Sequence, residues 1–295
     1  MNKRRGIILI ALGNPYYGNL ASNLAASIRA TAPNLEILLI WGEDAIAQLD
    51  QSKLNLFHQL LEAPPELYHR KGKKSYVKAK TRIYDLSPFT ETIFLDVDTI
   101  LLPKHSISEA FDEFNRRGID FTMENRSRVN LAENRSDQFY LWADIKDIRK
   151  TFGFKSGHLY GLHSEFIYFK KSKRIEKYFE TVKEIYENPR IKLKEFDGDI
   201  PDEFAFAMAM IKHDIYPHQC PYVPLYWYLT DKAKGSSLSY CIENYIGYSV
   251  GGNATPATVR KRYNQLAKSY FGRLGLQHPF PIRQKRQVLA SRKIM

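Results

Sequence analysis

The chain has 295 residues, 44% of them hydrophobic and 13% aromatic, which is enough to bury a sizeable core and excludes a disordered or fibrous protein. Two cysteines, Cys220 and Cys241, are too few for a disulfide framework and indicate a reducing compartment. No stretch approaches the ~20 apolar residues of a membrane helix, so we expect a cytoplasmic protein.

The predicted elements alternate between buried strands and helices. Residues 3–5 are basic and precede an apolar run, as in a secretion signal, but a turn at Gly13-Asn14-Pro15 ends the run early and favours a buried first strand. Apolar runs and helical spacing predict, in chain order, strand 6–12, helix 20–32, strand 36–41, helix 76–86, strand 91–95, helix 106–117, strand 119–124, strand 164–169 and helix 203–212. The opening β-turn-α-β pattern is typical of a parallel α/β sheet.

Two segments lack a clear strand or helix pattern. The segment between strands 119–124 and 164–169 is rich in Asn, Arg, Tyr and Gly, and we interpret it as an irregular surface excursion. The last ~35 residues show two short helical patterns and a basic end, which we expect to be partly disordered. Residues 217–224 are predicted to be a proline-punctuated loop.

The net charge of +12 is unevenly placed. No acidic residue follows Glu243, and residues 70–82 carry seven Lys or Arg without one acid. Such blocks favour polyanions, although a solvated face or a floppy tail would have the same composition. Ten basic residues of the tail supply ten of the twelve net charges: Arg260, Lys261, Arg262, Lys268, Arg273, Arg283, Lys285, Arg286, Arg292 and Lys293.

Two carboxylates, Asp96 and Asp98, directly follow the predicted strand 91–95. The carboxyl ends of strands are where open α/β folds bind ligands. Mn²⁺ and Mg²⁺ prefer oxygen ligands and bind through one or two carboxylates plus substrate phosphates. The pattern therefore predicts a metal site, although an Asp-X-Asp pair also fits a phosphatase nucleophile or a strand-end cap. The phosphatase motif follows a first strand, which this pair does not.

The stretch Lys80-Thr81-Arg82-Ile83-Tyr84-Asp85-Leu86, followed by Ile93-Phe94-Leu95-Asp96-Val97-Asp98-Thr99, resembles the glycogenin-like branch of the GT-A glycosyltransferases. The resemblance implies an α/β fold, a Rossmann-like sandwich with a mixed central sheet, and a Mn²⁺ or Mg²⁺ cofactor. It implies that Lys80 reaches the donor sugar or diphosphate, that Asp96 contacts ribose and metal, and that Asp98 binds the metal. It covers residues 6–255 and leads us to expect a catalytic domain over 1–255 with a basic extension over 256–295.

Three further blocks match the family in order. Residues 11–17 end the first strand where the family holds the nucleoside, and Ser164 is kept from an Asn-Ser-Gly strand in which His163 and Glu165 replace Asn and Gly. Asp202 and Glu203 match an Asp-Gln pair that meets the sugar, although acids also cap helices. The resemblance thus implies catalytic roles for Asp202, Glu203 and Lys80, and donor contacts from Ala11, Leu12, Gly13, Asn14, Tyr17, Lys80, Asp96, Val97, Ser164 and Gly251.

The sequence departs from the family at its C-terminal His-X-X-Gly-X-X-Lys motif. Gly251 fits, but Tyr248 replaces the histidine and Ala254 the lysine. Tyrosine is a poor Mn²⁺ ligand at neutral pH, so water or Asn253 would complete the metal shell, or the site is weakened. A degenerate GT-A fold that only binds its ligand is therefore a second hypothesis.

The acceptor is indicated only by the basic tail, where Arg260, Lys261, Arg262, Lys268 and Arg273 are candidate polyanion-binding residues. One hypothesis is a bacteriophage-type transfer to hydroxymethylated DNA bases, with phosphates gripped by the tail and the base flipped out onto tyrosines. The alternative is a bacterial surface glycan or lipid-linked oligosaccharide, with the tail on an anionic membrane. The donor by resemblance is a UDP-hexose, and the sequence leaves retention or inversion of configuration open.

Overall fold

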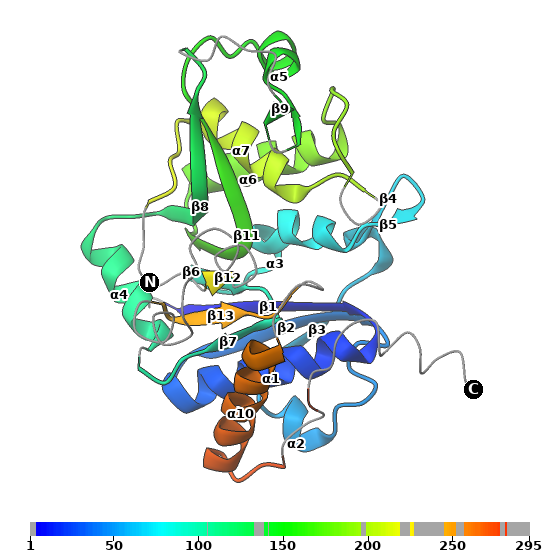
Figure 1. Ribbon diagram of the computed structural model, residues 1–295, viewed down its shortest axis with the longest axis vertical. Helices are drawn as coiled ribbons and strands as arrows, with labels where there is room; N and C mark the ends of the chain where they lie inside the picture. Colours follow the sequence, from blue (N-terminus) through cyan, green and yellow to red (C-terminus); the bar gives the residue numbers. More distant parts are fainter. Residues whose placement is uncertain are drawn as a thin grey trace. The chain divides into compact units, whose positions relative to one another are not determined.

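The computed structural model describes residues 4–104, 106–132, 139–140, 142–195, 199–218, 225–226, 245–251, 257–277 and 281 (Figure 1). The chain divides into two compact units, each of which is built from separate stretches of sequence. Unit 1 comprises Met1–Arg4, Ala63–Phe94 and Gly118–Gln219, and unit 2 comprises Arg5–Glu62, Leu95–Arg117 and Cys220–Met295. Among the described residues, no helix is both long and apolar enough to cross a membrane.

Unit 2 begins with three parallel strands, as the opening pattern predicts. β1 (Arg5–Gly13) pairs with β2 (Glu36–Glu43), which pairs with β3 (Gln59–Glu62). Helix α1 (Pro15–Thr31) starts five residues earlier than predicted, because the Asn14 side chain caps it by accepting the Tyr16 N–H at 3.0 Å. A short helix, α2 (Gln51–Leu54), precedes β3.

A second, small sheet of unit 2 follows the two aspartates. β7 (Thr99–Leu101) pairs antiparallel with β13 (Gly247–Ser249), and β12 (Leu225–Tyr226) pairs parallel with β13. Two helices hold β7 in place, since its Leu101 N–H donates to Ser27 Oγ of α1 at 3.3 Å and its carbonyl accepts the Tyr270 hydroxyl at 2.8 Å. Helix α4 (Ile107–Arg116), capped by the Ser106 side chain, lies close to its predicted bounds.

Where the sequence predicts two short helical patterns near the C-terminus, the structure describes one long helix, and most residues after Gln277 lie outside the described ranges. One helix, α10 (Ala257–Arg273), carries a buried stripe that packs against α1, and it belongs to unit 2. Its aromatic and aliphatic residues recur at three- and four-residue spacing, which is the signal for a single amphipathic helix. The buried residues of this stripe are Val259, Tyr263, Leu266, Ala267, Tyr270 and Phe271.

Substituting Gly247 by alanine is expected to destabilise the small sheet of unit 2. A Cβ at this position would lie 2.3 Å from the Ile100 carbonyl oxygen, so β13 and β7 would have to separate. Overpacking of this kind costs about 1–3 kcal/mol. Gly272→Ala is the matched control, because nothing lies within 4 Å of that position and alanine is the better helix former. Thermal unfolding should show a lower midpoint for Gly247→Ala only. Equal midpoints for the two variants would contradict the close approach of Gly247 to the Ile100 carbonyl.

Unit 1 is built on a long antiparallel pair of strands with helices against it. β8 (Phe121–Asn130) and β11 (His158–Lys170) pair in register from His158↔Asn130 to Phe169↔Phe121, with two irregularities. Helices α6 (Lys173–Glu187) and α7 (Asp202–His213) pack on each other, and α7 packs on β11. The Tyr178 hydroxyl of α6 donates to the Phe206 carbonyl of α7 at 3.2 Å.

The predicted surface excursion is therefore wrong in its described parts. Both strands extend well into it, and β9 (Phe139–Tyr140), β10 (Ala143–Asp144) and helix α5 (Ile145–Phe152) follow. Polar residues along β8 concealed the strand, because an edge strand paired on one side needs no continuous apolar run. Helix α6 was not predicted, although its apolar residues recur at helical spacing.

The remaining elements of unit 1 lie between residues 63 and 95. A 3₁₀ turn, η1 (Pro65–Leu67), precedes the hairpin of β4 (His69–Arg70) and β5 (Lys73–Lys74), and the predicted helix 76–86 consists of a 3₁₀ segment, η2 (Tyr76–Arg82), and α3 (Ile83–Leu86). β6 (Glu91–Leu95) has the predicted bounds and is buried throughout. It contains the division between the units, which falls after Phe94. The fold is thus α/β, with parallel and antiparallel strand pairs, as predicted.

Candidate functional site

The two predicted metal ligands lie in unit 2, at the carboxyl end of β6. Asp96 and Asp98 are half-buried, and the intervening Val97 is buried. Asp98 Oδ1 accepts the Ser249 hydroxyl at 2.6 Å, and the Asp98 carbonyl accepts the Val250 N–H at 2.9 Å. These bonds tie the aspartate turn to β13, so the Asp98 carboxylate has a fixed position.

This arrangement fits a hard divalent cation that is completed by phosphate oxygens. Within the described ranges no group of three or more His, Cys, Asp or Glu residues could hold a metal by itself. Two half-buried carboxylates without a protein cage are what Mg²⁺ or Mn²⁺ uses when the substrate supplies further oxygens. Asp96 and Asp98 would be the protein ligands of such an ion.

Ser249 is a site residue that the sequence analysis did not single out. The family motif directs attention to Tyr248, one residue earlier, but Tyr248 is fully buried opposite Ile100 and lies in the interior of unit 2. Alternation along a strand places the Ser249 hydroxyl on the other face, where it reaches Asp98. Gly251 lies half-buried beyond it and donates its N–H to Ser249 Oγ at 3.4 Å. Asn253 and Ala254 lie outside the described residues.

The turn between β1 and α1 lies close to Asp98. Burial raises the pKa of Tyr16 to about 12, with a further contribution from the Asp98 carboxylate and an opposing one from Arg260 of α10. Tyr16, Asp98 and Arg260 are therefore near one another in unit 2. Burial also raises the pKa of Tyr263, with a smaller contribution from Asp98, so α10 contributes to the surroundings of the aspartates.

The predicted donor-binding residues of the first strand line the same turn. Ala11 and Leu12 are buried, so the structure leaves little of either residue, backbone included, exposed to a ligand. Gly13 adopts a φ of 93° and its carbonyl accepts the Asp44 N–H at 3.0 Å, which joins the ends of β1 and β2. Asn14 and Tyr17 are half-buried. Together these residues form the edge of the parallel strands in unit 2.

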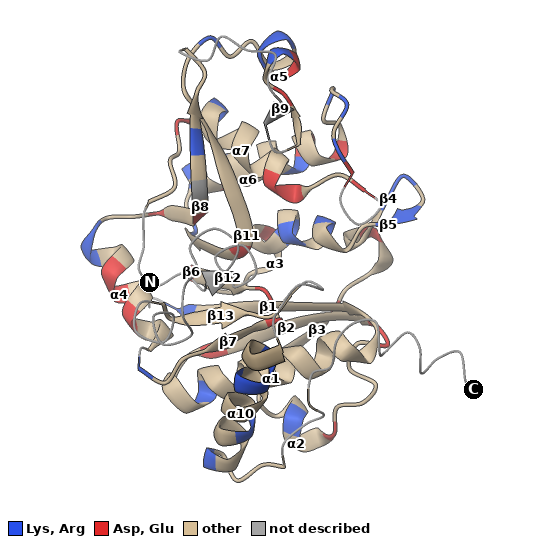
Figure 2. Ribbon diagram, viewed as in Figure 1, with Lys and Arg blue, Asp and Glu red and all other residues tan. Residues whose placement is uncertain are grey.

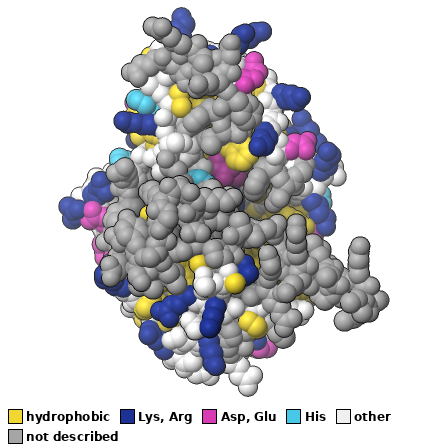
Figure 3. Space-filling view, viewed as in Figure 1, with side chains coloured by type: hydrophobic (Ala, Val, Ile, Leu, Met, Phe, Trp, Pro, Cys, Tyr) yellow, Lys and Arg dark blue, Asp and Glu magenta, His cyan; other side chains and the backbone are white. Residues whose placement is uncertain are grey.

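The basic residues of α10 lie along its exposed side (Figures 2 and 3). Lys261, Lys268 and Arg273 are exposed, whereas Arg260 and Arg262 are half-buried. Lys261 and Lys268 lie on the side of the helix opposite to the buried stripe, whereas Arg260, Arg262 and Arg273 lie at the borders of the stripe. The tail residues from Arg283 onward lie outside the described residues.

A second cluster of predicted residues lies in unit 1. Lys80 of η2 donates from Nζ to Ser164 Oγ of β11 at 3.1 Å, and Nζ lies 5.6 Å from the centre of the Phe94 ring. Asp202, at the start of α7, is buried and lies near Lys80 and Ser164. Burial raises the pKa of Asp202, while Lys80 and a hydrogen bond from Ser164 oppose the rise. Three segments far apart in sequence thus bring Lys80, Ser164 and Asp202 together.

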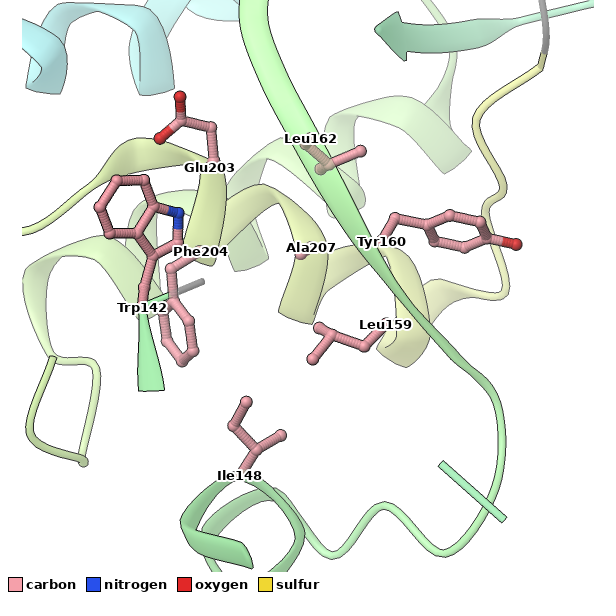
Figure 4. Close-up of a pocket in the computed structure, with 8 residues that line it drawn as sticks. All are labelled: Trp142, Ile148, Leu159, Tyr160, Leu162, Glu203, Phe204 and Ala207. Carbon is pink, nitrogen blue, oxygen red and sulfur yellow. The ribbon is translucent and has the colours of Figure 1, made fainter. Parts of the chain in front are cut away.

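Glu203 lies beside Asp202 and borders an apolar hollow of unit 1 (Figure 4). Its Oε2 atom is buried and has no hydrogen-bond partner, although part of the side chain is exposed. Burial raises the pKa of Glu203 well above its usual range, and Asp202 and Glu165 add to the rise. The side chains that line the hollow are Trp142, Ile148, Leu159, Tyr160, Leu162, Glu203, Phe204 and Ala207.

An ion pair fixes the segment that leads into α7. Arg70, on the β4–β5 hairpin, forms a two-pronged pair with Asp199, three residues before Asp202, and the Arg70 Nε to Asp199 Oδ2 distance is 2.9 Å. Both side chains are more than 90% buried, so removing one partner would leave an uncompensated charge. Arg70 therefore stabilises this loop, and its charge is not available to an external polyanion.

The rest of the basic block 70–82 is also divided by the fold. Lys78 pairs with Glu187 at 2.7 Å, and Arg82 lies 3.7 Å from the same carboxylate. The exposed members are Lys71, Lys73 and Lys74 on the hairpin. The block is thus mainly a set of internal contacts of unit 1, which the composition alone did not reveal. His163 lies 3.4 Å from Glu165, which gives it a local partner within β11.

Comparison with known proteins identifies the fold. No family model and no curated protein matches the sequence, but solved structures do. WbbM, a bifunctional glycosyltransferase, is 12% identical with a TM-score of 0.56, and the galactosyltransferase LgtC, solved with donor and acceptor sugar analogues, is 12% identical with a TM-score of 0.54. The chain has a GT-A glycosyltransferase fold.

The matches cover most of this chain and differing shares of the other proteins. The LgtC match spans 89% of this chain and 95% of LgtC, and the WbbM match spans 87% of this chain but 47% of WbbM. GlyE of Streptococcus pneumoniae, 13% identical with a TM-score of 0.51, is matched over 95% of this chain and 65% of its own. The fold expected from the resemblance is confirmed, and membership of the glycogenin-like branch stays a prediction.

Proposed function

We propose that this protein is a metal-dependent glycosyltransferase that moves a sugar from a nucleotide-diphosphate donor, by resemblance a UDP-hexose, to a hydroxyl acceptor. The observation that carries the proposal is the pair Asp96 and Asp98 at a strand end of a GT-A fold, with Asp98 held by Ser249. In the reaction the bond from the anomeric carbon to the diphosphate breaks, and the acceptor oxygen takes its place.

In unit 2 we assign nucleoside and diphosphate binding. Asp96 and Asp98 would hold Mn²⁺ or Mg²⁺, which when bound neutralises the charge that gathers on the leaving diphosphate. Ser249 holds the Asp98 carboxylate in position, so the residue is prepared for its ligand before the donor binds. The turn at Gly13 and Asn14 supports the nucleoside from the edge of the parallel strands.

In unit 1 we assign contacts to the transferred sugar. Lys80, Ser164 and Asp202 form a connected set of hydrogen-bonding groups that is largely shielded from water. Sugar hydroxyls both donate and accept hydrogen bonds, and such a mixed cluster satisfies both roles. Because the cluster is buried, its hydrogen bonds are stronger than they would be in water. A carboxylate base for inversion could also come from Asp202.

A screen of nucleotide sugars with Mn²⁺, read by thermal unfolding, tests the donor assignment. A donor at 100 times its dissociation constant stabilises the fold by about 2.7 kcal/mol, which raises the unfolding midpoint. We expect stabilisation by UDP-sugars that disappears with a chelator. Stabilisation by a donor whose sugar is transferred neither to an acceptor nor to water would favour the alternative, a catalytically degenerate GT-A binding module.

A polyanionic acceptor, with DNA as the first candidate, is the second part of the proposal. The observation that favours it is the exposed basic side of α10, where Lys261, Lys268 and Arg273 face solvent on a helix anchored by its buried stripe. Lysines and arginines on one side of a helix bind phosphates without reading sequence. A surface glycan or lipid-linked acceptor on an anionic membrane would use the same charges.

Binding to duplex DNA should fall steeply with salt. If three phosphates are neutralised, a plot of the logarithm of the association constant against the logarithm of the salt concentration should have a slope of about −2.7. Reversing Lys261, Lys268 and Arg273 to glutamate should abolish this binding, whereas reversing Lys177 and Lys212, exposed on helices of unit 1, should not. Fluorescence anisotropy with DNA and co-sedimentation with anionic vesicles separate the two acceptors, since equal or tighter binding to vesicles would overturn the choice of DNA.

A further inference from the structure

The cluster around Asp202 in unit 1 contains more acids than its nearby lysine can neutralise. Asp202 and Glu203 are consecutive on α7. The negative charge of Glu165, on β11, raises the pKa of both. The positive charge of Lys80, on η2, lowers the pKa of both carboxyls. His163 pairs with Glu165, and Glu124 of β8 stands opposite His163 in the strand register.

Asp202 and Glu203 are adjacent and each has a carboxyl oxygen buried away from water, so two ionised carboxylates here would repel each other strongly. Asp202 is 1% exposed, and its Oδ2 atom, like Glu203 Oε2, is buried with no hydrogen-bond partner. An ionised oxygen in that position would lose its hydration without compensation. One proton shared by the pair removes most of this cost, as in carboxyl pairs elsewhere.

The surroundings of the two carboxyls differ, and the difference places the proton. Asp202 accepts a hydrogen bond from Ser164, which stabilises an anion, whereas Lys80 lies near both carboxyls and does not distinguish them. Glu203 lines the apolar hollow together with Trp142, Leu162 and Phe204, and its carboxyl group lies next to the Trp142 ring (Figure 4). An apolar wall favours the neutral acid. The pKa of Glu203 is raised chiefly by burial and then by Asp202, which agrees with this division.

We infer that the Asp202–Glu203 pair carries one proton in the folded chain, that the proton resides on Glu203, and that Glu203 offers it as a hydrogen-bond donor to a hydroxyl of the transferred sugar. The location of the proton follows from unit 1 alone, and the donor role rests on the proposed function. Asp202 then remains an acceptor, so the two neighbouring side chains have opposite hydrogen-bonding roles.

The test compares the full-length wild type with Glu203→Gln and Glu203→Met in Mn²⁺-dependent hydrolysis of a UDP-sugar across pH. Glutamine is a permanent donor, so Glu203→Gln should retain clearly more of kcat than Glu203→Met and should lose the decline of kcat at high pH. Methionine has similar length without a donor and should lower kcat by about tenfold or more. Equal activity of the two variants would overturn the donor role, and loss of activity in Glu203→Gln at every pH would show that an ionised carboxylate is needed.

Glu165→Gln tests whether the neighbouring acids raise the pKa of Glu203. Removing a negative neighbour should lower the pKa of Glu203, so the alkaline decline should move to lower pH while the maximal kcat is retained. If the pH dependence of kcat does not move, the neighbouring acids do not raise the pKa of Glu203.

The proton itself can be tested without activity. A carboxyl whose pKa is raised on folding stabilises the protein at low pH, and this stability is lost as pH rises through its folded pKa. The unfolding midpoint of Glu203→Gln relative to wild type should therefore increase from pH 5 to pH 8. A protonated-acid infrared band should be present in wild type and absent from Glu203→Gln. If neither the change in unfolding midpoint nor the infrared band is seen, Glu203 carries no proton. If both are seen but no UDP-sugar is turned over, the proposed function is wrong and the proton assignment stands.

Discussion

Replacing Asp98 by alanine is expected to reduce Mn²⁺-dependent turnover of a UDP-sugar by roughly 10³-fold, the loss that follows when a principal charge-stabilising group is removed. The Asp98 carboxylate is half-buried and held by Ser249, so it offers a preformed ligand to the metal diphosphate. Without it, the diphosphate must leave with its charge uncompensated. Initial rates at saturating donor, with Mn²⁺ varied, measure the effect.

Asp112→Ala is the matched control for this change. Asp112 is also an aspartate of unit 2, but its side chain is 71% exposed and its partner is the half-buried Arg5. Exposed ion pairs contribute about 0–1 kcal/mol, so its activity and unfolding midpoint should stay near those of wild type. Ser249→Ala should cause an intermediate loss that excess Mn²⁺ partly restores. Full activity of Asp98→Ala would remove the basis for the metal assignment.

Replacing Asp202 by asparagine is expected to reduce kcat by about 10²–10³-fold while leaving the affinity for UDP and Mn²⁺ close to that of wild type. Asp202 is the buried acceptor near Lys80 and Ser164 in unit 1, whereas we assign the nucleotide to unit 2. Asparagine preserves the size of the side chain but removes its charge. Steady-state kinetics and titration of UDP into the Mn²⁺-loaded protein separate the two quantities.

Stability separates this effect from misfolding. Because burial raises the pKa of Asp202, its ionised form costs free energy in the folded chain, and asparagine should leave the unfolding midpoint unchanged or higher at neutral pH. Asp214→Asn, at the exposed C-terminal end of α7, is the control, since asparagine accepts the φ of 52° there. A drop in UDP affinity that parallels the drop in kcat would argue against a role limited to the sugar.

The parts of the fold that were predictable are those with short-range signals. The apolar runs gave β1, β2 and β6 within two residues, and the Asp-X-Asp pair falls directly after β6. β8 and β11 were predicted too short, because their outer halves are held by pairing with each other rather than by apolar runs. The length of α10 was not predicted, since its many basic residues concealed the stripe around Tyr263 and Tyr270.

The site shows the same contrast. Lys80, Ser164 and Asp202 were chosen from a resemblance, and the structure brings them together from three separate elements of unit 1. Ser249 was missed because only the register of β13 against β7 reveals that its hydroxyl meets Asp98. Similarly, the pairing of Arg70 with Asp199 joins residues 129 apart in sequence, and no local pattern could have shown that this charge is internal.

The measurement that tests the central claim most directly is release of UDP from UDP-sugars by the wild-type chain, with Mn²⁺ and with a chelator. The account predicts release that requires the metal, returns when Mn²⁺ is added back, and is lost when Asp98 is changed to alanine. Binding of UDP-sugars that is indifferent to the chelator, or turnover that survives in the Asp98 variant, would contradict a metal-diphosphate site at Asp96 and Asp98.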